Sequence, residues 1–175
     1  GFRGTRYHAL NWAPIFWECG CDILAYDHRG HGDSTPAFHT YGYYEKEDAV
    51  AALDWFTARS GLERSQIGVF GVSYGAATAL QMAPMTPEIA VAPERSVADI
   101  KVPVLLIHSL TDEYTLSTHS EDIYANSDKS RTVLHLTDWG APHARDISTD
   151  PAAYEQLVDD FLAQFVPNFG LVPTP

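Results

Sequence analysis

The stretch IGVFGVSYGAATAL, residues 67–80, constrains this chain more than any other. A serine lies between two glycines, after an apolar run and before a run of small residues. This order predicts a strand, a sharp turn and a helix, with the hydroxyl of Ser73 projecting from the turn. Gly71 and Gly75 must be small because strand and helix pass close together there. The pattern favours Ser73 as a nucleophile, with the backbone N–H of Tyr74 binding an oxyanion. The alternative is a glycine-rich turn with a solvated serine.

Short apolar runs alternate with amphipathic stretches, which is typical of a mostly parallel α/β sheet with flanking helices. The predicted strands are short and apolar, as strands covered on both faces should be. They are Ile23–Tyr26, Ile67–Phe70, Val104–Ile107 and Thr132–Leu136. The predicted helices are Leu10–Glu18, Tyr44–Arg59, Tyr74–Ala83, Ser117–Ala125 and Tyr154–Phe165. We expect one domain over residues 1–175, since 175 residues suffice for a single core.

A nucleophilic serine needs a base and an acid, and candidates for both follow it along the chain. The stretch VPVLLIHSLTDEYT is a strand, a turn and then Asp112, and LHLTDWGAPHARD is a strand followed by a loop that carries His143. We expect His143 to take the proton from Ser73 and return it to the leaving group. Asp112 would hold the imidazole tautomer and stabilise its cationic form.

Other residues compete for these two roles. Glu113 or Asp138 could supply the acid, although Asp112 is preferred because it follows the strand by a short turn. His108 and His135 compete as the base. Both lie in or at the end of predicted strands, where a hydrogen-bonded core histidine is the default.

These stretches together resemble the α/β-hydrolase superfamily, closest to its serine aminopeptidase-like or esterase/lysophospholipase-like branch. ILAYDHRGHGDS resembles the family's strand and D-x-R-G-x-G-x-S loop, and YGYYEKEDAVAALDW the helix that leads to the nucleophile elbow. GVSYGAA resembles the elbow, IKVPVLLIHSLTDEYT the strand and loop of the acid, and WGAPHA the histidine loop. The resemblance covers nearly the whole chain, and the order Ser73, Asp112, His143 is that of α/β-hydrolases. It implies the α/β-hydrolase fold.

The family pattern is incomplete at two places. GFRGTR resembles the oxyanion loop after the third strand, which implies that the backbone N–H of Phe2 is the second oxyanion donor and that strands one to three are missing. The interval from Ser73 to Asp112 is short for a strand, a helix and a cap. Either Ile89–Ala92 is a very short sixth strand, or residues have been lost near Pro84; we favour the loss.

These gaps predict an unusual sheet. The family's strand order, 1-2-4-3-5-6-7-8, leaves only the last two predicted strands as natural neighbours, so we expect the chain to be part of a larger hydrolase. One possibility is that the strands keep family spacing, with gaps of about 9.6 Å. The other is that they close up and move Ser73 away from His143. A Ser73 hydroxyl within about 3.5 Å of a His143 ring nitrogen would favour the first arrangement. A continuous, fully hydrogen-bonded sheet with a strand at Ile89–Ala92 would instead contradict the loss of residues near Pro84.

The expected activity is hydrolysis of a carboxylic ester of modest size through an acyl-enzyme on Ser73, with no cofactor. Amide or thioester substrates are near alternatives, and a catalytically inactive hydrolase-fold binding module is another. A metallohydrolase is a further alternative because His28, His31 and Asp33 stand in close order and His108 and Asp112 could join them.

Composition limits the partners. The net charge of −12, from 23 acidic and 11 basic residues, argues against nucleic acid or an anionic membrane, and no stretch of about 18 apolar residues predicts a transmembrane helix. We expect a small acyl substrate as the partner; the oligomeric state is open. Cys19 and Cys21 are too close in sequence for a relaxed disulfide, and free thiols fit a reducing, cytoplasmic location.

Overall fold

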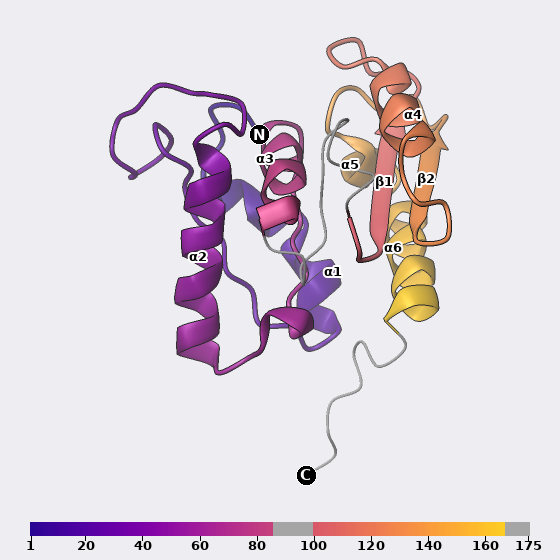
Figure 1. The fold of residues 1–175 in the computed structure, drawn as a ribbon. Helices are drawn as coiled ribbons and strands as arrows, with labels where there is room; N and C mark the ends of the chain where they lie inside the picture. Colours follow the sequence, from indigo (N-terminus) through magenta and orange to yellow (C-terminus); the bar gives the residue numbers. More distant parts are fainter. Residues whose placement is uncertain (86–99, 167–175) are drawn as a thin grey trace.

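Two parallel strands form the sheet of the computed structural model, which describes residues 1–85 and 100–166. Strand β1 (Val104–Ser109) pairs with β2 (Thr132–Thr137) in a register that sets Val104 opposite Thr132 and Ser109 opposite Thr137. Both carboxyl ends lie at the top of the molecule in Figure 1. Helices flank this sheet on both faces, so the predicted α/β architecture is confirmed, including the direct pairing of the last two predicted strands.

The helices of the second half follow from local signals. Helix α4 (Ser117–Ala125) crosses over between β1 and β2, as predicted. Helix α6 (Pro151–Phe165) begins three residues earlier than expected, because the Asp150 side chain accepts a hydrogen bond from the Ala153 backbone N–H (3.0 Å) and Pro151 suits the first turn. The four-residue helix α5 (Asp146–Thr149) was not predicted.

The first half contains the remaining helices. The predicted helix Leu10–Glu18 is divided, because Pro14 lacks an N–H and lies in the first turn of a new helix. The structure has a 3₁₀ turn η1 (Arg6–Asn11), α1 (Ala13–Glu18), α2 (Glu45–Ser60), a 3₁₀ turn η2 (Arg64–Gln66), α3 (Tyr74–Met82) and a 3₁₀ turn η3 (Ala83–Met85). Helix α2 ends at Gly61, whose φ of 73° is the left-handed cap that glycine favours. No helix among the described residues is long and apolar enough to cross a membrane.

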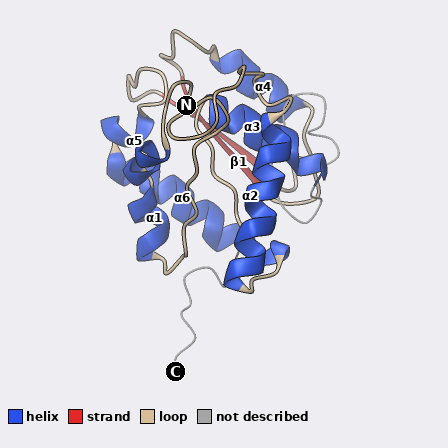
Figure 2. Ribbon diagram, turned by 90° about the vertical axis from the view of Figure 1, so that its left-hand side faces the viewer, coloured by secondary structure: helices blue, strands red, loops and turns tan. Residues whose placement is uncertain are grey.

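The two faces of β1 pack against different helices because successive side chains of a strand point to opposite sides. Val104 and Leu106 pack with Leu80 of α3 and Ile123 of α4. The alternate side chains of β1 lie on the other face with α1, α5 and α6, in a cluster that includes Ile15, Leu105, Ile107, Ile147, Tyr154 and Val158. Figure 2 shows α1, α5 and α6 to one side of β1 and α3 and α4 to the other.

A third apolar cluster joins α2 to α3. Leu53 of α2 and Met82 of α3 are buried together, with Tyr26, Ile67 and Val69 packed against them. The predicted strands Ile23–Tyr26 and Ile67–Phe70 therefore lie against a core, as their apolar character indicated.

These two segments are nevertheless not strands, and that part of the prediction is wrong. Within the described residues, no backbone N–H of residues 22–28 or 68–73 donates a hydrogen bond to a backbone carbonyl. A strand needs a neighbour to form its ladder, and none lies beside either segment in the part of the chain that the structure describes. The apolar pattern predicted contact with the core but carried no information on pairing. The cover expected on both faces is also incomplete, because Ile23 and Phe70 are exposed. The possible strand Ile89–Ala92 lies outside the described residues.

Candidate active site

Ser73 lies at a strained turn directly before α3. Its φ of 53° and ψ of −117° are rarely adopted by a residue with a side chain. Its carbonyl already accepts the first helical hydrogen bond, from the Ala77 N–H at 3.1 Å. The turn therefore projects the Ser73 side chain away from the helix, as the strand-turn-helix pattern predicted.

Only one of the two glycines around Ser73 is required by space. A Cβ built on Gly71 would lie 2.5 Å from the carbonyl carbon and oxygen of Gly75, so any side chain at position 71 collides with the backbone of α3. A Cβ on Gly75 would meet nothing within 4 Å. The expectation that both positions must be small is thus wrong for Gly75, because the close approach involves its backbone and not the side where a Cβ would point.

Three side chains from separate segments meet in a hydrogen-bonded line. The Ser73 hydroxyl lies 2.7 Å from His143 Nε2, and His143 Nδ1 lies 2.6 Å from Asp112 Oδ2. Asp112 follows β1 and His143 follows β2. Because these paired strands are parallel and in register, their carboxyl ends lie at the same edge of the sheet, and the loops that carry Asp112 and His143 both begin there. With Nδ1–H donating to the carboxylate, Nε2 is free to accept the serine proton. The structure therefore brings together the three residues singled out from the sequence, and the Ser73–His143 distance favours family spacing.

The local environment keeps Asp112 ionised. Burial raises the pKa of this carboxyl, but hydrogen bonds from the Thr115 N–H, from His143 and from the Tyr114 N–H outweigh burial and hold its pKa below the usual value. Both backbone N–H groups donate to Oδ1 at 2.9 Å, which leaves Oδ2 for His143. At neutral pH the carboxylate can therefore stabilise a cationic imidazole.

Two hydroxyls tie the acid loop to the histidine loop, and the sequence gave no indication of them. Ser109, the last residue of β1, donates to the carbonyl of Ala141 at 2.7 Å, and Thr111 donates to the same oxygen at 2.9 Å. Ala141 is completely buried, two residues before His143. These bonds fix the distance between the loops that carry the acid and the base.

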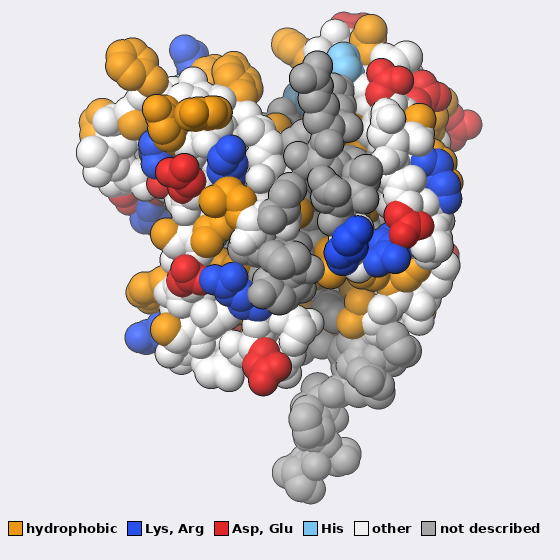
Figure 3. Space-filling view, in the orientation of Figure 1, with side chains coloured by type: hydrophobic (Ala, Val, Ile, Leu, Met, Phe, Trp, Pro, Cys, Tyr) orange, Lys and Arg blue, Asp and Glu red, His pale blue; other side chains and the backbone are white. Residues whose placement is uncertain are grey.

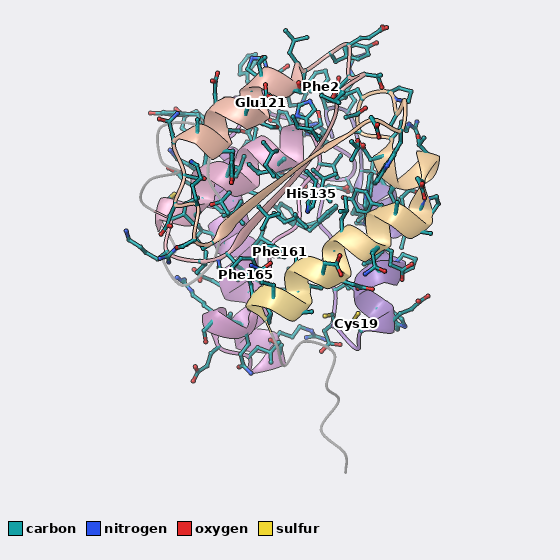
Figure 4. The ribbon with its side chains drawn as sticks, turned by 90° about the vertical axis from the view of Figure 1, so that its right-hand side faces the viewer. Phe2, Cys19, Glu121, His135, Phe161 and Phe165 are labelled. Atoms are coloured by element: carbon teal, nitrogen blue, oxygen red, sulfur yellow. The ribbon has the colours of Figure 1, made fainter. Side chains whose placement is uncertain are left out.

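The competing residues have other surroundings. His108 is hydrogen-bonded to the carbonyl of Thr115 (2.8 Å) and to the Ser120 hydroxyl (2.6 Å), so it supports the acid loop as a core histidine. His135 lies within β2, opposite Ile107 of β1, and Figure 4 places it over the sheet. Glu113 and Asp138 are exposed, and neither is hydrogen-bonded to His143 in the described part of the chain.

The two predicted oxyanion donors lie beside Ser73. A Cβ built on Gly1 would be 4.0 Å from Ser73 Cβ, which places the start of the chain against the nucleophile. The Phe2 ring packs against the Tyr74 ring with centroids 6.1 Å apart. Neither the Phe2 N–H nor the Tyr74 N–H donates a hydrogen bond to another described residue. The role of both groups in binding an oxyanion stays a prediction.

Glu45, the first residue of α2, was missed by sequence reasoning. Its carboxylate is fully buried and accepts four hydrogen bonds: from the Thr40 N–H (2.8 Å), the Thr40 hydroxyl (2.5 Å), the Gly42 N–H (2.8 Å) and the Tyr74 hydroxyl (2.6 Å). Burial raises the pKa of Glu45, but the bonds from Thr40 and Tyr74 outweigh it and bring the pKa to about 2. The sequence indicated only an acidic first turn, and nothing in the spacing marked a bond to residue 74.

The proposed metal ligands do not converge. Arg6 forms ion pairs with both Asp27 and Asp33, and Asp27 also accepts the Asp33 N–H (3.1 Å). The His28 and His31 rings lie 6.2 Å apart, each with a buried ring nitrogen that has no hydrogen-bond partner. Among residues 1–85 and 100–166, no group of three or more His, Cys, Asp or Glu side chains is placed to hold a metal ion. The DHRGHGD loop is organised by salt bridges and turns.

The glycines of the elbow form a matched pair for mutation. We expect Gly71→Ala to lower the free energy of unfolding by about 1–3 kcal/mol or more, because its Cβ overlaps the α3 backbone. Gly75→Ala should be neutral or stabilise by about 0.5–1 kcal/mol, because alanine favours the helix. Urea unfolding of both variants measures the difference, and equal effects would contradict the observed close approach.

Replacing Glu45 by glutamine tests its buried bonds. The amide presents a donor to groups that already donate, so Glu45→Gln should cost about 2 kcal/mol or more, while Glu47→Gln on the exposed side of the same turn should cost little.

Since the folded pKa of Glu45 is lowered to about 2, ionisation of Glu45 stabilises the fold above its usual pKa of 4.5. This contribution to the free energy of unfolding fades as the pH falls towards 2. Urea unfolding should therefore show a smaller gap between Glu45→Gln and the parent near pH 3 than near pH 7. A gap that is constant with pH would contradict this account.

Comparisons with known proteins agree with this architecture. The family model of the alpha/beta hydrolase fold matches residues 1–91. The chain is 25% identical to the uncharacterized protein YqkD of Bacillus subtilis over 205 residues, which take in 89% of this chain and 66% of YqkD. It is 32% identical to the uncharacterized protein Rv2307c of Mycobacterium tuberculosis over 103 residues, 57% of this chain and 36% of that protein. The chain thus spans less than two thirds of the curated relatives it matches.

Solved structures of other proteins are similar to this chain over most of its length. The esterase Pf2001 of Pyrococcus furiosus is similar with a TM-score of 0.82 at 21% identity, over 95% of this chain and 79% of that one. The YqkD match spans 205 residues but only 89% of a 175-residue chain, so YqkD has residues inside the match that are absent here. On the family match and the shared fold, this chain belongs to the α/β-hydrolase fold family.

Proposed function

We propose that this protein is a serine hydrolase that cleaves carboxylic esters through an acyl-enzyme on Ser73. The observation that carries the proposal is the continuous hydrogen-bonded line from the Ser73 hydroxyl through His143 to Asp112, at 2.7 Å and 2.6 Å. A nucleophile, a base and an orienting acid in contact are the parts that acyl transfer requires. The side chain of His143 is about a quarter exposed, so a substrate can reach it.

The first half of the reaction forms the acyl-enzyme. His143 Nε2 takes the proton of the Ser73 hydroxyl as its oxygen bonds to the ester carbonyl carbon. The N–H groups of Phe2 and Tyr74 would stabilise the resulting oxyanion, and one such donor is worth about 3–4 kcal/mol of barrier. When the C–O bond to the alcohol breaks, His143 gives the proton to the departing oxygen, and the acyl group stays on Ser73.

The second half regenerates the enzyme with water. His143 takes a proton from water, whose oxygen bonds to the acyl carbon, and then returns that proton to the Ser73 oxygen as the acid leaves. All proton transfers use residues of this chain, so the reaction is complete without a cofactor. The similarity to a protein named as an esterase favours esters over amides or thioesters as substrates.

Covalent labelling tests the nucleophile. A fluorophosphonate should label the chain at Ser73, and Ser73→Ala should abolish labelling and lower kcat for p-nitrophenyl acetate by several orders of magnitude with the fold intact. The measurement is intact mass and peptide mapping, with circular dichroism to check folding. Absence of labelling on the folded parent chain would instead favour a binding module that has lost activity.

The acid is tested by a neighbouring pair of variants. Asp112→Asn should lower kcat about 10⁴-fold, because an amide cannot stabilise the imidazolium and favours the wrong tautomer. Glu113→Gln should change kcat by less than about threefold, since Glu113 is exposed and has no bond to His143. Steady-state hydrolysis of p-nitrophenyl acetate by both variants gives the comparison, and a reversed order would move the acid to position 113.

A further inference from the structure

Exposed aromatic side chains approach Ser73 from the two loops that rise on either side of α3. Tyr114, in the loop after β1, is 88% exposed, and its ring centroid lies 5.6 Å from that of His143. Tyr41, in the loop before α2, is 60% exposed and stacks on Phe2 at an interplanar angle of 15°. Figure 1 shows these loops at the upper right and upper left, with the start of α3 between them. Figure 3 shows hydrophobic side chains gathered over the upper left.

The Tyr41 side is held firmly although it is exposed. The φ of Tyr41 is 50°, a left-handed conformation that a bulky residue rarely adopts. Gln81 of α3 donates to the Tyr41 carbonyl at 2.6 Å, and buried Glu45 accepts the N–H groups of the residues on either side, Thr40 and Gly42. The ring also packs edge-on against Tyr74 with centroids 5.2 Å apart. A strained loop that fixes an exposed aromatic ring beside a nucleophile indicates a binding role.

The Tyr114 side is fixed through the acid. The Tyr114 N–H donates to Asp112 Oδ1, so the backbone at this position moves with the carboxylate that orients His143. The ring itself has no hydrogen bond to any described residue and leaves most of its surface uncovered. Its large apolar face therefore lies next to the imidazole and is open to a ligand.

The direction of proton transfer indicates which part of the substrate lies near each of the two aromatic groups. His143 must reach the oxygen of the departing alcohol, so the alcohol part of an ester lies on the His143 side of Ser73. The carbonyl oxygen points to the N–H groups of Phe2 and Tyr74, which leaves the acyl part near the Phe2–Tyr41 pair. Resting on the proposed function, we propose that Tyr114 binds the alcohol part of the substrate and the Phe2–Tyr41 pair binds the acyl part. The favoured substrates are then esters of aromatic alcohols with an apolar acyl group.

Separate measurement of acylation and deacylation tests this assignment. Deacylation begins from the same acyl-enzyme whichever alcohol has left, so the effect of a variant on deacylation is the same for aryl and ethyl esters of one acid. We expect Tyr114→Ala to lower kcat/KM about tenfold for p-nitrophenyl butyrate and less than about twofold for ethyl butyrate. Any change in the deacylation rate constant, from stopped-flow kinetics after the p-nitrophenol burst, should be smaller than the loss of kcat/KM for the aryl ester.

The acyl side is tested with the complementary variant. Tyr41→Asn keeps a residue that tolerates positive φ and removes the ring. It should lower kcat/KM for both butyrates by the same factor, about five- to tenfold, and alter deacylation of the butyryl-enzyme, with much smaller changes for the acetates. Phe38→Ala is the matched control, because Phe38 is 93% exposed in the same loop and stacks on no described ring.

The outcomes distinguish a failure of the substrate-side assignments from a failure of the proposed serine hydrolase function. Equal losses on the aryl and ethyl esters for Tyr114→Ala overturn the alcohol-side assignment, while the p-nitrophenol burst still supports the acyl-enzyme. An effect of Phe38→Ala as large as that of Tyr41→Asn overturns the acyl-side assignment. A folded parent chain that gives no burst and no fluorophosphonate label overturns the proposed function and this inference with it.

Discussion

The in-register, parallel pairing of β1 with β2 is the constraint on which the candidate site depends. Because the strands are parallel and in register from Val104–Thr132 to Ser109–Thr137, their following loops leave the sheet at the same height. Asp112 and His143 then need only short turns to meet. Ser109 completes the arrangement by reaching across to the Ala141 carbonyl, so the end of one strand holds the loop of the other. A register shift of one residue would displace the acid from the base by about one strand step, roughly 3.3 Å, which is more than the length tolerance of a hydrogen bond.

In the first half of the chain, carboxylates hold neighbouring segments together, as the sheet does in the second half. The segments 22–28 and 68–73 have no ladder among the described residues, and their surroundings are organised by side chains instead. Asp27 accepts bonds from Arg6 and Asp33, Asp48 pairs with Arg29 through both oxygens, and Glu45 gathers the loop before α2 onto Tyr74. Charged acceptors suit this task because a carboxylate offers about four acceptor sites to backbone groups that would otherwise be buried without partners.

Sequence patterns predicted the parts of this molecule that depend on local signals. The elbow around Ser73, helix α4 and the pairing of the last two strands follow from glycine placement, apolar periodicity and chain order. Asp112 and His143 could be identified because each follows an apolar strand by a short turn. The strands Ile23–Tyr26 and Ile67–Phe70 were overpredicted, because an apolar run indicates packing against a core whether or not a partner strand exists. Glu45 was missed for another reason: its donors are backbone groups and one hydroxyl nearby in the sequence, and a second hydroxyl 29 positions away.

The hydrogen bond between Ser73 and His143 also joins the two halves of the molecule. Ser73 belongs to the first half, with α2 and α3, and His143 to the second half, with β1 and β2. The halves meet along the cluster around Leu80 and Val104 and along the cluster in which α1 packs with α5 and α6. Local opening along such a boundary requires less free energy than complete unfolding. A displacement of the halves by little more than an ångström would break this bond while every helix and strand stayed intact. The hydrogen-bonded line at Ser73 therefore depends on how closely the two halves are docked. It is broken by a smaller displacement than the one needed to disrupt the helices and strands.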